Sequence, residues 1–149
     1  MNSNAIPIDR IDYKTRISEQ LEQDNEVIAI LLAQTYIEGL LTQWLFITGN
    51  ITKHKKNITD KIERFGLANI LTIHLVLGNI NYEMFNQIKS LSEFRNLIAH
   101  KLAFIEYNDS LKRKAKNIAV NSIEICSGIS GLFNKYLDNK SKEVISRSG

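Results

Sequence analysis

The chain contains little cysteine and little proline, and each absence excludes a class of structure. Its one cysteine, Cys126, excludes an internal disulfide and a metal site made of several thiolates, and it is typical of a reducing compartment. The one proline, Pro7, leaves the rest of the chain without a proline ring to break a helix. A charged start followed by an apolar segment is also missing, so we expect no secretory signal and a cytoplasmic location.

The motifs of several cofactor-dependent enzymes are missing as well. The sequence has no phosphate-binding P-loop, no dinucleotide fingerprint and no nucleophile elbow. His54 and His74 have no second ligand one helical turn away, and His74 lies in an apolar segment, which is typical of a packed side chain. We therefore expect neither a metal nor another cofactor.

One long apolar run raises the question of a membrane span. Residues 27–47 are mostly apolar and are about long enough to cross a bilayer. Gln34, Glu38 and Gln43 lie in the middle of the run, however, and a carboxylate at that depth is unfavourable. The pattern favours a buried core helix and no membrane partner.

Periodicity, capping residues and glycine stops predict an all-α chain. Residues 67–77 are dense in isoleucine and leucine, which permits a strand, but their length and flanks favour a helix. We expect an up-and-down bundle of about five to six helices in a single domain, 1–138, with a flexible serine- and lysine-rich tail over 139–149. The expected helices cover 9–23, 25–48, a short segment from 60 to 65, 67–77, 81–102 and 111–137.

The two long helices of the second half should each turn an apolar stripe to the core. In the first, Asn81 is the expected N-cap. In the second, the turn at 107–110 supplies the cap. The inward residues are Phe85, Ile88, Leu91, Ile98 and Leu102 in the first, and Leu111, Ile118, Ile125, Ile129, Leu132 and Tyr136 in the second.

The most informative stretch is the hexapeptide Arg95-Asn96-Leu97-Ile98-Ala99-His100. An arginine can hold a phosphate, and a histidine titrates near neutral pH and can move a proton. Asn96 and His100 are one helical turn apart and share a face, whereas Arg95 and His100 are about 140° apart on an ideal helix. Either the helix loosens near His100, or the arginine stem bends across it, or a second copy of the helix, crossing antiparallel about a two-fold axis, completes the site. The spacing favours a composite site in a homodimer.

Other charged residues could support this stretch. Glu38 is either buried and paired with Arg95 or exposed on a wet side of its helix, and the sequence leaves both open. Residues 1–35 carry three basic and six acidic side chains, so the remainder has an excess of six positive charges. Such short basic runs usually face solvent, but they can also meet the phosphates of RNA. The candidates for RNA contact are Lys53, Lys55, Lys56, Lys101, Lys112, Arg113 and Lys114.

The run from Leu91 to Lys101 resembles the signature of the HEPN superfamily of small helical domains. Members carry an arginine and a histidine separated by four to six residues, commonly with a polar residue directly after the arginine. Arg95, Asn96 and His100 match this pattern. A more diffuse similarity over about 25–135 resembles the branch that contains mannitol-operon-repressor-like domains, through the segments 36–41 and 62–67.

The resemblance implies a metal-independent endoribonuclease that acts as a homodimer, in a toxin–antitoxin or phage-defence pair. It implies that His100 is the general base or acid, that Arg95 stabilises the charge of the transition state, and that Asn96 orients His100 or holds a phosphate oxygen. An antitoxin or other regulatory protein would then be a partner. The alternative is a non-catalytic HEPN-like module, similar to the mannitol-repressor branch, that binds protein or RNA. In a third reading, Arg95 and His100 only brace a helical dimer.

Overall fold

A computed structural model shows an all-α fold, as the sequence predicts. It describes residues 12–48, 60–62, 64–103 and 106–148. The helices with defined bounds are α1 (Tyr13–Glu22), α2 (Glu26–Thr48), α4 (Leu67–Val76), α5 (Tyr82–Ala103) and α6 (Asp109–Ser148), and residues 60–62 are also helical. Residues 67–76 are thus helical and not extended, as their flanks predicted.

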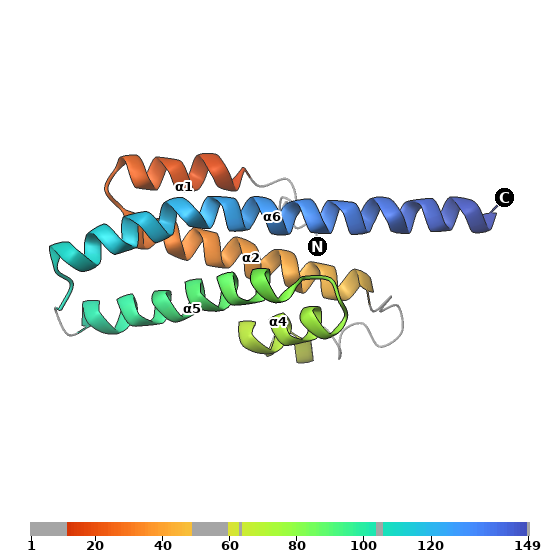
Figure 1. Cartoon of the computed structure of the whole chain (residues 1–149), viewed down its shortest axis with the longest axis horizontal. Helices are drawn as coiled ribbons and strands as arrows, with labels where there is room; N and C mark the ends of the chain where they lie inside the picture. The colour runs from red at the N-terminus through yellow and green to blue at the C-terminus, as the bar shows by residue number, and fades with distance from the viewer. Residues whose placement is uncertain (1–11, 49–59, 63, 104–105, 149) are drawn as a thin grey trace.

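Helix α2 is the centre of the bundle. It packs against α1, α4, α5 and α6 (Figure 1), and its buried side chains include Ile37, Leu40 and Trp44. Within the described residues it is the one helix that is long and apolar enough to cross a bilayer, judged by length and composition. In this structure its apolar side chains supply much of the shared hydrophobic core instead.

The turns that end α1 and α4 have the same hydrogen-bond pattern. Asp24 follows α1 with a φ of 57°, and Gly78 follows α4 with a φ of 75°. In both cases the backbone N–H groups of this residue and of the one after it donate to carbonyl oxygens in the last turns of the helix. Asp24 donates to Leu21 and Asn25 to Gln20, and Gly78 donates to Leu75 and Asn79 to His74. Asp24 occupies a conformation that favours glycine, and its carboxylate pairs with Lys116 of α6. The pair lowers the pKa of Asp24 and raises that of Lys116.

The predicted N-caps of the second half are confirmed. The Asn81 side chain accepts a hydrogen bond from the backbone N–H of Met84, at 2.8 Å, at the start of α5. The Asn108 side chain accepts one from Leu111, at 2.9 Å, at the start of α6. Between α1 and α2, in contrast, the Asn25 amide donates to the Gln20 side chain.

The predicted inward face of α6 is wrong by about a sixth of a turn, or about 60° at about 100° per residue. The buried stripe consists of Ala115, Ala119, Ser122, Cys126, Ile129 and Phe133. Of the predicted set only Ile129 is fully buried, and the others are half-buried at the flanks. The small residues permit α2 to approach closely, since the thiol of Cys126 lies 3.8 Å from the Ala33 carbonyl oxygen. In α5, Leu102 was also predicted to face inward, and it is exposed.

The last helix was predicted to end near Leu137, and this is also wrong. It continues to Ser148 and projects past the other helices (Figure 1), so residues 139–148 are helical. They contain no glycine or proline, and the Lys140 ammonium donates to the Ile47 carbonyl oxygen at 2.7 Å, in the last turn of α2. A cation at the carbonyl end of a helix is favourable, so this contact stabilises both helices at that point.

His74 is a packed side chain, as expected, and it is completely buried. Its Nε2 lies 2.7 Å from the Leu41 carbonyl oxygen and its Nδ1 lies 2.9 Å from the Asn79 side-chain nitrogen. A carbonyl can only accept and an amide nitrogen can only donate, so Nε2 carries the proton. Burial lowers the pKa of His74, although the hydrogen bond to Leu41 acts in the opposite direction.

Candidate functional site

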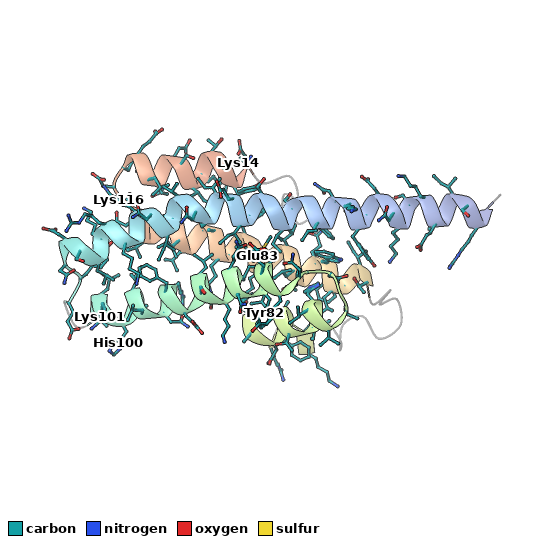
Figure 2. The ribbon with its side chains drawn as sticks, in the orientation of Figure 1. Lys14, Tyr82, Glu83, His100, Lys101 and Lys116 are labelled. Atoms are coloured by element: carbon teal, nitrogen blue, oxygen red, sulfur yellow. The ribbon has the colours of Figure 1, made fainter. Side chains whose placement is uncertain are left out.

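The hexapeptide lies in the last turns of α5, at an accessible end of the bundle. Asn96 and His100 are exposed and Arg95 is half-buried. Figure 2 shows His100 and Lys101 close together at the end of α5, on the outside of the molecule. The side chains that the sequence singled out are therefore open to a ligand and are not part of the core.

The Arg95 side chain bends toward the face of the helix that carries His100. Its guanidinium donates from Nη1 to the Asn96 side-chain oxygen at 3.1 Å. Asn96 shares its face with His100, because the two are four residues apart. The contact therefore places the guanidinium beside an amide on the His100 face, while positions 95 and 100 stay in one regular α-helix.

Glu106 belongs to this end of the molecule, and the sequence reasoning missed it. The Glu106 backbone N–H donates to the Lys101 carbonyl at 2.8 Å, and its carboxylate pairs with the Lys101 ammonium. The pKa of Glu106 is lowered, chiefly by this hydrogen bond and charge and to a smaller extent by the charge of His100. A carboxylate therefore lies within electrostatic reach of His100. No local motif marks it, because the contact depends on the chain turning back after α5.

Tyr107, the next residue, anchors this turn to the start of α2. Its hydroxyl donates to the Oε1 atom of Glu26, a carboxylate that is 3% exposed. Burial and this hydrogen bond raise the pKa of Tyr107. The other carboxylate oxygen, Oε2, has no hydrogen-bond partner among the residues that the structure describes. The turn that carries Glu106 is thus held by a buried contact on one side and an exposed ion pair on the other.

The basic candidates divide into those near the hexapeptide and those outside the described chain. Lys114 of α6 has its ammonium 5.4 Å from the centre of the Phe94 ring, directly beside Arg95 in sequence. Lys112 and Arg113 precede it in the first turns of α6, and Lys101 follows His100. The predicted contacts at Lys53, Lys55 and Lys56, with His54, lie outside the described residues.

Glu38 is half-buried and does not pair with Arg95. No ion pair between the two appears among the side chains that the structure describes, where the hydrogen bond of Arg95 goes to Asn96. Nor do the described residues contain a group of three or more histidine, cysteine, aspartate or glutamate side chains that could hold a metal ion. The arrangement can hold an anion and move a proton, with Arg95, Asn96 and His100 as its central groups.

Comparison with known proteins adds no relative: no family model, characterised protein or solved structure matches this chain. The likeness to the HEPN superfamily therefore depends on the residues of the motif themselves.

Proposed function

We propose that the protein is a metal-independent endoribonuclease of the HEPN type that acts as a homodimer. The observation that carries the proposal is the accessible cluster of Arg95, Asn96 and His100 at the end of α5, with the guanidinium turned toward the face of His100. An arginine, an amide and a titratable histidine are sufficient for RNA because the 2′-hydroxyl is an internal nucleophile.

In this mechanism the 2′-oxygen attacks the neighbouring phosphorus as His100 removes its proton. The bond from phosphorus to the 5′-oxygen breaks, and a 2′,3′-cyclic phosphate forms. The leaving 5′-oxygen needs a proton, which the second His100 of a dimer supplies as the general acid. Arg95 stabilises the extra negative charge on the phosphoryl oxygens, and Asn96 holds the guanidinium in place. DNA lacks the 2′-hydroxyl and is not a substrate by this route.

The setting that the resemblance implies is a toxin or a phage-defence component. An RNase whose site is open to solvent has to be restrained in its own cell, so a neutralising protein partner is part of this proposal. The exposed end of α5 is the surface that such a partner has to cover to block the site.

A non-catalytic binding module is the second candidate, and one observation favours it. Within a single chain, the side chains of Arg95 and Lys101 already have partners in Asn96 and Glu106, and the hexapeptide contains only one histidine. A chain that does not dimerise would then bind RNA or protein through this end without cleaving it.

Cleavage of RNA in EDTA by wild type, Arg95→Ala and His100→Ala tests the proposal, with the exposed amide variant Asn134→Ala as the matched control. We expect each motif variant to lose at least about 100-fold in rate, because one positioned acid–base group typically contributes about 10²–10⁴. The control should cleave like wild type. Equal cleavage by all four proteins, or cleavage that requires a metal ion, would contradict the mechanism. A wild type that binds RNA but does not cleave it, together with folded motif variants that bind RNA more weakly, would establish the binding module instead.

A further inference from the structure

A groove of about 1060 Å³ runs between the first half of α5 and the middle of α6. It is as large as the biggest ordinary ligand pockets, which span about 300–1,000 Å³, and it is open along one side. Asn86, Gln87 and Asn121 contribute side-chain amides to its walls, and Leu91, Ile118 and Ile125 supply an apolar floor. This combination of hydrogen-bonding edges and an apolar surface suits flat, polar-edged rings.

An exposed aromatic residue stands at the rim of the groove. Tyr82 is 67% exposed, and its ring is stacked on Phe85, with 6.0 Å between the centroids and 13° between the planes. Phe85 supports one face of the tyrosine and leaves the ring available for a further flat partner. Aromatic side chains in this position stack with the bases of single-stranded nucleic acids.

The charged residues that line the groove are carboxylates, and lysines lie beyond it toward the end of α5. Glu83 and Glu124 line it at the start of α5, whereas Lys101 and Lys114 lie where α5 ends. Carboxylates repel phosphates but accept hydrogen bonds from the amino groups of bases, and lysines attract phosphates. The distribution therefore orients a nucleic acid with its backbone at the hexapeptide and its bases in the groove.

The groove side of α5 leads directly to His100. Positions 86, 90, 93, 97 and 100 follow one another at intervals of three or four residues, so they lie along one face. Ser90, which lines the groove, is about 15 Å from His100 along the helix axis at about 1.5 Å per residue. Glu93 lies on this path, and Lys89 partly neutralises it at 3.9 Å. A single RNA strand can therefore contact both the groove and His100.

We propose that the α5–α6 groove binds unpaired bases of a single-stranded RNA, a few nucleotides from the phosphate that His100 and Arg95 contact. This inference rests on the proposed ribonuclease function and gives it a substrate class, single-stranded RNA read by its bases. Paired bases in a duplex cannot present their Watson–Crick edges to the amides, so duplex RNA fits the groove poorly.

The test measures binding of labelled oligoribonucleotides of A, C or U, and of a duplex of equal length, by fluorescence anisotropy in EDTA. A His100→Ala background prevents cleavage. The double variant Asn86→Ala/Asn121→Ala is compared with Asn134→Ala/Asn139→Ala, which removes two exposed amides of α6 away from the groove. We expect the parent to prefer single strands and at least one base, and the groove variant to lose about tenfold in affinity for that base. Tyr82→Ala should weaken the binding of every single-stranded oligomer, and Tyr82→Phe, which keeps the ring, should bind as the parent does.

The outcomes separate this inference from the nuclease. If the histidine is required for cleavage but the groove variant binds every oligomer as its control does, the inference is wrong and the nuclease stands. If base preference depends on the groove but wild type never cleaves, the nuclease is wrong and the base site stands. If no RNA binds, both are wrong. A groove variant that changes the sedimentation mass identifies the groove as an interface between two copies and overturns the inference.

Discussion

His74 and His100 each lie in the last turn of a helix, and their surroundings give them opposite properties. His74 is completely buried, beside Trp44, with both ring nitrogens hydrogen-bonded. His100 is exposed at the free end of α5, with Lys101 and Glu106 next to it. Burial and two hydrogen bonds fix the first ring in one tautomer and disfavour its charged form, whereas the second ring is exposed to solvent beside charged neighbours. The difference shows that burial and neighbouring groups decide the chemistry of a histidine, whereas its position in the last turn of a helix does not.

The largest effect should come from replacing each histidine with glutamine and measuring cleavage. We expect His100→Gln to reduce the rate by about 10²–10⁴, because the amide cannot take up or release the proton. His74→Gln should leave the rate per folded molecule unchanged, since His74 has no access to RNA. An equal loss of rate per folded molecule in both variants would contradict the assignment of a catalytic role to His100 and a structural role to His74.

Stability should respond in the opposite order. His74→Ala leaves a cavity beside Trp44 and leaves the Leu41 carbonyl without its donor, so the free energy of unfolding should fall by about 2–4 kcal/mol. His100→Ala changes an exposed position and should alter it by less than about 0.5 kcal/mol. Urea unfolding of the two variants beside wild type measures both values. A larger loss for His100→Ala would contradict the assignment of His74 as the structural histidine.

The buried ring should also make stability depend on pH. The pKa of His74 in the folded state is lower than its ordinary value of 6.5, so the unfolded state binds more protons than the folded state as pH falls through about 6.5. The free energy of unfolding should therefore fall as pH falls from about 6.5, by up to about 1.4 kcal/mol per unit, until the folded pKa is reached. Urea unfolding between pH 7.5 and 5.5 checks this. His74→Gln should reduce the dependence of the free energy of unfolding on pH, and His100→Gln should leave it unchanged. The reverse result would contradict the assignment of this pH dependence to His74.

The smallest effects should come from the neighbours of the two rings. Asn79→Ala removes the donor to Nδ1 of His74 and should lower the free energy of unfolding by about 0.5–1.5 kcal/mol. Glu106→Gln removes an exposed partner of Lys101 and should change stability less than Asn79→Ala does. Thermal unfolding of both variants compares them directly. A greater loss for Glu106→Gln would mean that the exposed end is more tightly coupled to the fold than its accessibility suggests.

Much of the fold follows from local chemistry in the sequence. Asn81 and the turn before α6 act through neighbours within a few residues, so their roles as N-caps could be predicted. The long apolar run of α2 likewise identified the central helix. The hexapeptide could be found because its residues are contiguous, and its position on the accessible end of α5 agrees with a chemical role.

What could not be predicted depends on contacts between distant residues. Much of the buried face of α6 consists of alanine, serine and cysteine because α2 approaches closely there. A prediction from hydrophobic periodicity selects large apolar side chains instead, such as Ile118 and Ile125, and these lie on the flank of the buried face. The helical end of α6 is held where Lys140 meets α2, 93 residues away in sequence. Glu106 could not be identified for the same reason, since its place beside Lys101 requires the turn that Tyr107 anchors to Glu26.

The close approach of α2 and α6 also gives the protein a built-in probe of its own opening. Cys126, the single thiol of the chain, is completely buried, its Sγ faces the Ala33 carbonyl, and burial raises its pKa to about 12. A thiol reagent attacks the thiolate and needs access to it, so labelling has to wait until the two helices separate. The rate of alkylation of the wild-type chain therefore measures how often α2 and α6 separate enough to expose Cys126, and no cysteine has to be introduced.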